Sequence, residues 1–236
     1  VIVYGGEKCR SVAAVQNGHR LGLWWDEGDR GTRKRRTPIS QIVLHHQGGE
    51  GGAQQLYRVL DGGRVSRRSG KPIFLSVHFS IDRDGQITQH ADLETCCFHA
   101  GGWNNDRSVG IEIANRGLAP AAASVPRVAY RDTLHGRELE FLRFTPEQVG
   151  AVHDLLIDLV GLLHVPYEFP TKQGALVTRE MSQGAIRGFR GILGHWHLTR
   201  KKIDPSPHLI RDLMASASIV REPEAPNLSA TKTRKR

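Results

Sequence analysis

Two short apolar runs that end in histidine constrain the fold of this chain most. The first, IVLHH, ends in His45 and His46, and glycines break the pattern shortly afterwards. The second, GILGH, ends in His195. Short apolar runs bounded by glycine and polar residues are typical of buried strands. The sequence therefore predicts strands that deliver His45 and His195 to the edge of a buried sheet.

Two further segments predict strands. SVHFSI and QITQHA flank Asp84 and Gly85, a pair that favours a tight hairpin turn because glycine adopts a positive φ at little steric cost. From Ser108 to Ala114, apolar residues alternate with Gly110 and Glu112. Because side chains alternate across a strand, Glu112 is expected on the face opposite the isoleucines.

One helix is clearly marked by its sequence. Thr145 suits the N-cap, Pro146 suits the first turn and Gln148 completes a capping box. Apolar residues then recur at helical spacing as far as Leu163, so we expect one buried stripe along this helix.

Strands and helices in mixed order predict a single α/β domain, with a central mixed β-sheet flanked by helices and a site at the strand ends. We expect the folded domain to cover 38–218. It would follow an N-terminal extension over 1–37, where the pattern is weak, and precede a disordered basic tail over 219–236. The stretch 116–143 has no sustained period and is expected to be a surface excursion.

The charge of the chain indicates an anionic partner. Its formal net charge is +9 and its sequence pI is about 9.9, with basic runs at RGTRKRRT and KTRKR. Clustered basic residues of this kind are usually solvated, so we expect Arg33 to Arg36 to be a linker and Lys232 to Arg236 a tail. No helix-turn-helix, zinc-finger or aromatic stacking pattern accompanies them, which argues against a specific nucleic-acid partner. No window holds the roughly 18 apolar residues of a membrane span.

His45, His195 and Asp204 form a candidate metal site. Asp204 follows His195 by nine positions, and a loop of that length can return its carboxylate to the histidine. Two histidines and one carboxylate suit a catalytic zinc ion, because three protein ligands leave the fourth tetrahedral position for water. With twelve histidines in the chain, the spacing alone fits structural histidines as well.

Four blocks of the sequence resemble a known family. IVLHH, SVHFSIDRDGQITQ, FHAGGWNNDRSVGIEIAN and GHWHLTRKKIDPSP occur in the order and spacing of the N-acetylmuramoyl-L-alanine amidases, a family that includes phage lysins and peptidoglycan recognition proteins. The resemblance covers about 42–213. It implies a zinc-dependent catalytic domain that cleaves the amide bond between N-acetylmuramic acid and L-alanine of bacterial peptidoglycan, as a cell-wall lysin does.

The resemblance also implies roles for particular residues. His45, His195 and Asp204 would hold the zinc ion. Glu112 would take a proton from the attacking water and pass it to the leaving amine, and Lys202 would stabilise the oxyanion.

The residues around FHAGGWNN are candidates for substrate binding. The resemblance implies that His99 contacts the substrate or the transition state. Trp103 could stack on a sugar, and Asn104 and Asn105 could donate or accept hydrogen bonds. His46 is expected to be a packed neighbour of the metal site. We expect a structural role for His197, because it would face away from the site if its strand continued.

The sequence leaves one alternative of a different kind, a non-catalytic module of the same fold that binds muropeptides. The complete ligand set, with Glu112 and Lys202, argues against it. Some members of the family carry a tyrosine where this chain has Val77, so any role of that hydroxyl is absent here. We expect a monomer. The segment VIVYGGEKCR lacks the pattern of a secretory signal.

Overall fold

The centre of the protein is a six-stranded mixed β-sheet. The computed structural model describes residues 1–118 and 128–220, with side chains described through residue 216. All neighbouring strands are parallel except β8 and β9, which form the predicted hairpin around Gly85. The predicted α/β class with a central mixed sheet is confirmed. In spatial order the strands are β16 (Gly191–Gly194), β5 (Gln41–His46), β11 (Ser108–Ile113), β8 (Phe79–Ile81), β9 (Ile87–Gln89) and β3 (Val15–Asn17).

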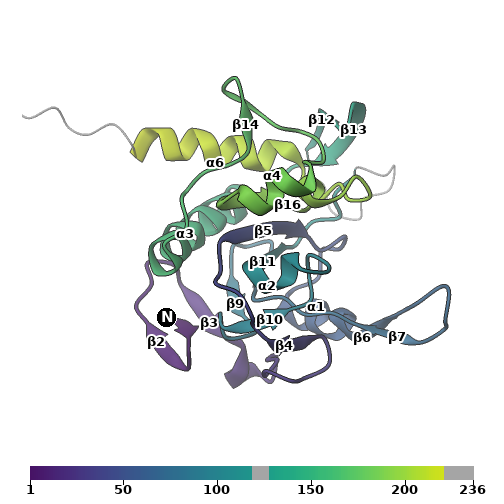
Figure 1. Ribbon diagram of the computed structural model, residues 1–236, viewed down its shortest axis with the longest axis vertical. Coiled ribbons are helices and arrows are strands. Elements are labelled where there is room, and N and C mark those ends of the chain that lie inside the picture. Colours follow the sequence, from purple (N-terminus) through teal and green to yellow (C-terminus); the bar gives the residue numbers. More distant parts are fainter. Residues whose placement is uncertain (119–127, 221–236) are drawn as a thin grey trace, which may run out of the picture.

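Helices α3 (Pro146–Leu163) and α6 (Pro207–Val220) cover one face of this sheet (Figure 1). The capping box predicted at the start of α3 is present, with Thr145 Oγ1 accepting from the Gln148 backbone N–H. Most of the apolar stripe of α3 is buried in one cluster with the isoleucines of β11, which gives the fold its main hydrophobic core. No helix among the described residues is long and apolar enough to cross a membrane.

Smaller elements surround this core. The short helices are η1 (Gly18–Leu21), α1 (Ala53–Leu60), α2 (Asn104–Arg107), α4 (Gln183–Gly188) and α5 (His195–Leu198). The two-stranded sheets pair β1 (Ile2–Tyr4) with β2 (Glu7–Cys9), β4 (Thr32–Lys34) with β10 (Thr95–Cys97), β6 (Asp61–Val65) with β7 (Pro72–Phe74), β12 (Ala129–Leu134) with β13 (Arg137–Leu142), and β14 (Thr171–Lys172) with β15 (Ala175–Leu176).

The opposite face of the central sheet carries the polar site. Val43 of β5 packs there against a small cluster that includes Ala100 and Leu193, and His45 follows on the same face two residues later. Glu112 of β11 pairs with His45 in the parallel register. The alternation predicted for 108–114 therefore places Glu112 beside the histidine at the strand end.

The N-terminal segment is part of the fold, so the expectation that the regular fold starts only after residue 37 is wrong. Strand β3 forms an edge of the central sheet by pairing with β9, and β4 pairs with β10. Trp25 is fully buried and stacks on Tyr57, with ring centroids 4.4 Å apart. The strands are only three residues long and pair with distant segments, which explains why no local pattern revealed them.

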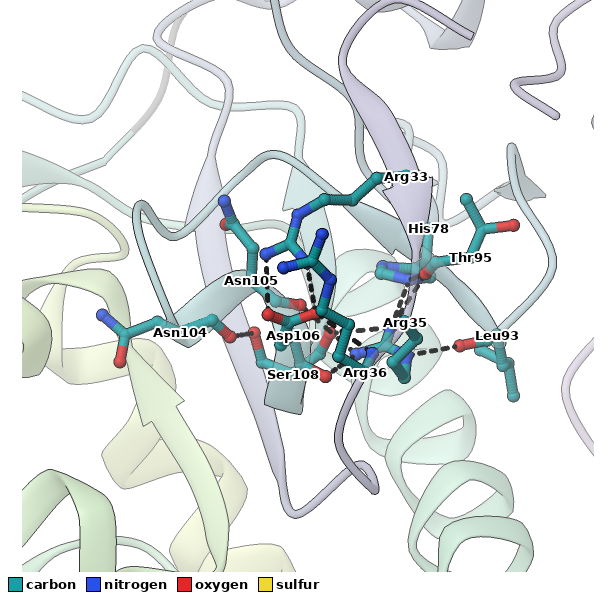
Figure 2. Close-up of polar contacts among 10 residues, drawn as sticks. All are labelled: Arg33, Arg35, Arg36, His78, Leu93, Thr95, Asn104, Asn105, Asp106 and Ser108. Atoms are coloured by element: carbon teal, nitrogen blue, oxygen red, sulfur yellow. Dashed lines mark hydrogen bonds and ion pairs between the residues drawn. The ribbon is translucent and has the colours of Figure 1, made fainter. Parts of the chain in front are cut away.

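The basic run also departs from the expected solvated linker (Figure 2). Arg33 forms a bidentate ion pair with Asp106, with N–O distances of 2.7 Å. Arg35 is partly buried, and its guanidinium donates to the backbone carbonyls of Leu93, Thr95, Asn105, Asp106 and Ser108. Five donors in one planar group satisfy carbonyls from several segments at once, which a lysine cannot do. The second run, 232–236, lies outside the described residues.

The expected surface excursion over 116–143 contains regular structure. Strands β12 and β13 form an antiparallel hairpin from Ala129 to Leu142. Leu134 and Phe141 of this hairpin are fully buried in the main core. The residues 119–127 of this stretch lie outside the described part of the chain.

Candidate metal centre

The three predicted metal ligands converge at one end of the sheet. His45 lies near the end of β5, and His195 follows the last residue of β16, the parallel neighbour of β5. Asp204 reaches them from the loop that precedes α6. This loop is held against α5 because the Trp196 indole N–H donates to the Pro205 carbonyl at 2.7 Å. The predicted return of Asp204 to His195 is therefore observed.

The ligand atoms are close to one another and buried. His45 Nδ1 lies 2.9 Å from His195 Nδ1 and 3.1 Å from Asp204 Oδ2, and His195 Nδ1 lies 2.9 Å from Asp204 Oδ2. Only 1%, 5% and 7% of the surfaces of His45, His195 and Asp204 are exposed. Zinc bonds of 2.0–2.1 Å in a tetrahedron separate neighbouring ligand atoms by roughly 3.3 Å, close to these distances.

The protonation of this cluster also fits a metal ion. Burial, together with the neighbouring His195, lowers the pKa of His45 to about 4, so His45 is neutral at pH 7. Burial by itself would raise the pKa of Asp204, but the close imidazoles of His195 and His45 outweigh it and hold this pKa well below its usual value. Neutral imidazoles and an ionised carboxylate are the forms that bind zinc. Of the described residues, these three form the group that could hold a metal ion.

A cavity of about 380 Å³ opens beside the three ligands. Glu112 and Lys202, the two predicted catalytic residues, both line it, as do His46 and His99. An apolar wall, formed mainly by α1, and the side chain of Arg64 complete the cavity. The sequence analysis predicts no role for the residues of this wall or for Arg64. The wall consists of Leu56, Val59, Leu60, Leu75 and Phe98.

Glu112 has the properties of a proton-transfer group. Burial raises the pKa of Glu112 to about 8, and the nearby negative charge of Asp204 acts in the same direction. Glu112 Oε2 is buried and has no hydrogen-bond partner among the described residues. A carboxyl group in this state is available to exchange a proton with water or substrate in the cavity.

Lys202 is exposed and lies on the loop between α5 and Asp204. His135, at the tip of the β12–β13 hairpin, donates from Nε2 to the Lys202 carbonyl at 3.0 Å. The Glu180 backbone N–H donates to His135 Nδ1 at 3.3 Å. The hairpin that the sequence had not predicted therefore supports the loop that carries Lys202.

Three of the candidate substrate residues, Trp103, Asn104 and Asn105, lie outside the lining of this cavity. Asn105 Oδ1 accepts the backbone N–H groups of His99, Ala100 and Gly101 at 2.7–3.1 Å, so Asn105 shapes this loop. The guanidinium groups of Arg107 and Arg187 lie 5.3 and 5.2 Å from the centre of the Trp103 ring. Trp103 thus makes cation–π contacts where sugar stacking was expected.

Three further histidines near the candidate metal ligands have distinct environments. His197 is buried and structural, as expected, but the chain turns into α5 there and does not continue as a strand. Its Nδ1 accepts the Gly194 N–H at 2.9 Å, and its Nε2 donates to the Val177 carbonyl at 2.9 Å. His46 lines the cavity and packs against Gly117, as expected for a neighbour of the site. Both ring nitrogens of His99 have partners within the protein, His45 and Ser108.

The fold and the site define a class of protein: an α/β domain with a buried two-histidine, one-aspartate centre and a carboxyl group beside it, as in metal-dependent hydrolases. The sequence model of the N-acetylmuramoyl-L-alanine amidases matches residues 35–207, most of the chain. The protein therefore belongs to the N-acetylmuramoyl-L-alanine amidase family.

The chain is similar to several solved structures at low sequence identity. A selenomethionine derivative of AmpD is 18% identical, with a TM-score of 0.47, over 82% of this chain and 95% of that one. Drosophila peptidoglycan recognition protein SD is 17% identical, with a TM-score of 0.49, over 89% and 95%. The amidase AmiD from E. coli, in complex with anhydro-N-acetylmuramic acid-L-Ala-D-gamma-Glu-L-Lys, is 18% identical, with a TM-score of 0.45, over 74% and 57%. None of the curated proteins matches the chain in sequence.

Proposed function

We propose that this protein is a zinc-dependent amidase that cleaves the bond between N-acetylmuramic acid and L-alanine in bacterial peptidoglycan. One observation carries the proposal. Glu112, with its raised pKa, lies in the same cavity as the complete donor set of His45, His195 and Asp204. A module that only binds muropeptides has no need for this combination.

A zinc ion bound by His45, His195 and Asp204 would supply a Lewis acid that polarises the scissile carbonyl and lowers the pKa of water. In its ionised form, Glu112 accepts a proton from the attacking water and then donates it to the nitrogen of the leaving L-alanine. The Lys202 ammonium group lies against the carbonyl oxygen as negative charge develops there. Stabilisation of this kind contributes several kcal/mol in a site that excludes water.

The apolar wall and the charged residues of the cavity suit a ligand with both apolar and anionic parts. Leu56, Leu60 and Phe98 offer apolar contact surface, whereas Arg64 and Lys202 are cationic. A muropeptide has an apolar lactyl and alanyl segment next to carboxylates, so its chemistry matches this lining. The proposal includes the role of a lysin that acts on the intact cell wall as a monomer.

Digestion of purified peptidoglycan, followed by mass analysis of the released fragments, tests this function. Free stem peptides that begin with L-alanine are expected; a chelator should abolish their release, and added zinc should restore it. Glu112→Gln, assayed in parallel, controls for contaminating hydrolases. Peptidoglycan that binds the protein but stays intact would instead identify a muropeptide-binding module.

A further inference from the structure

We propose that Ser108 and His99 are positioning residues that fix the tautomer and the ring orientation of the metal ligand His45. The inference rests on the metal site of the proposed function and adds to it a hydrogen-bond relay that ends at the Asn104 carbonyl. His45 Nε2 lies 3.0 Å from His99 Nδ1, and His99 Nε2 lies 3.2 Å from Ser108 Oγ. Ser108 Oγ lies 2.6 Å from the Asn104 carbonyl oxygen.

The chemistry of the last member sets the direction of the whole relay. A carbonyl oxygen can only accept, so the Ser108 hydroxyl donates its proton to Asn104. Ser108 Oγ then accepts from His99 Nε2–H. His99 Nδ1 is left as an acceptor, and it receives the Nε2–H of His45. The Nδ1 lone pair of His45 therefore points toward His195 and Asp204, which is the form that a metal ion requires.

The surroundings of His99 hold its ring in this orientation. A Cβ atom on Gly110 would lie 2.6 Å from His99 Nδ1, so the absence of a side chain at Gly110 makes room for the ring. The backbone N–H of His99 donates to Asn105 Oδ1 at 3.1 Å, which fixes the backbone at His99. Ser108 is fully buried at the start of β11, two residues before Gly110, so the relay is anchored on a strand of the central sheet.

The direct test measures zinc affinity, independently of turnover, by competition of the full-length protein with a chromophoric chelator. His99→Phe should weaken zinc binding by roughly 10–100-fold, the usual loss when the partner of a metal-bound histidine is removed. Ser108→Ala should weaken it less, because His99 remains. In the His99→Phe background, Ser108→Ala should have no further effect, since the relay is already broken.

The fold offers a matched control in Ser80→Ala. Ser80 Oγ bonds to His90 Nε2 at 2.8 Å, so it forms a second buried serine–histidine pair, on β8, that does not reach the metal ligands. Ser80→Ala is expected to lower the melting temperature without changing zinc affinity. Gly110→Ala should weaken zinc binding as His99→Phe does, because the added methyl group displaces the same ring.

Zinc affinity within twofold of wild type in both His99→Phe and Ser108→Ala would overturn the relay, whatever their melting temperatures. If His99→Phe fails to fold, Ser108→Ala decides the matter, because it removes a single oxygen atom. Wild-type protein that binds zinc tightly but leaves peptidoglycan intact would remove the proposed function and leave the relay standing. If the wild type cleaves peptidoglycan but the variants bind zinc as tightly as the wild type does, the relay is removed and the proposed function stands.

Discussion

Glu112 of β11 and His45 of β5 are register partners in neighbouring parallel strands. Because paired residues of parallel strands point to the same face, the carboxyl group and the metal ligand open into one cavity. The strand pairing of the central sheet thus places the proposed proton-transfer group, Glu112, beside the candidate metal ligand His45.

Glu112→Gln should retain zinc and lose turnover. The amide has a similar shape but cannot accept a proton from water, so kcat should fall by roughly 10²–10⁴-fold. Steady-state kinetics on a soluble muropeptide and the metal content of the purified variant measure the two effects. A variant with near wild-type kcat would show that another group serves as the base.

His135→Asn should lower kcat through Lys202. Asparagine tolerates the left-handed conformation of His135, whose φ is 55°, but its amide is too short to reach the Lys202 carbonyl. We expect a loss of several-fold in kcat with little change in KM, and partial rescue in His135→Gln. Arg137→Ala, on the same hairpin, is the control.

A Lys202→Ala background sharpens that test. If His135 acts through Lys202, His135→Asn should cause no further loss of kcat there. An equal loss in both backgrounds would assign His135 a role in stability alone.

Arg35→Met should destabilise the protein strongly. It removes the donors of five backbone carbonyls, and a buried polar group without a partner costs about 1–3 kcal/mol. We expect a loss of about 3 kcal/mol or more in the free energy of unfolding, measured by denaturant titration. Arg36→Met is the control, because Arg36 is exposed. Equal stability of the two variants would refute the role of Arg35.

Stability should fall as the pH drops below about 6.5. Burial lowers the pKa of His78 to about 3, with a further contribution from the charge of Arg35. Between the unfolded pKa of about 6.5 and the folded value, the unfolded chain binds a proton that the folded protein does not. The free energy of unfolding therefore decreases with decreasing pH across this window. His90 and His197, whose pKa values burial lowers to about 4 and about 3, act in the same direction.

Denaturant unfolding at several pH values, with a chelator present to remove metal linkage, measures this slope. The slope is proportional to the number of protons taken up on unfolding, and His78→Gln should lower that number by up to one. His164→Asn, at the exposed end of α3, is the control. In the folded protein His78 Nδ1 accepts the Gly110 N–H at 3.0 Å, so protonation there costs a buried hydrogen bond. A slope unchanged by His78→Gln would show that other groups cause the acid sensitivity.

Local patterns in the sequence determined the main core and the strand-end positions of the two candidate histidine ligands. The capping box of α3, the hairpin at Gly85 and the alternation through β11 depend on neighbours in the chain, so short-range rules were sufficient. The strand-end positions of His45 and His195 follow from the same rules.

Only the tertiary structure decided how the basic run and the loop residues are used. The sequence predicts a solvent-exposed Arg35, because the backbone carbonyls that it contacts lie 58 to 73 positions away in the chain. The closeness of Trp103 and Asn105 to His99 in sequence predicts substrate contacts. In the structure the Trp103 ring lies against Arg107 and Arg187, and Asn105 Oδ1 accepts backbone N–H groups of its own loop. Ser108 carried no signal at all. Burial and hydrogen-bond partners arise from contacts between distant segments, which a residue's neighbours in the chain do not encode.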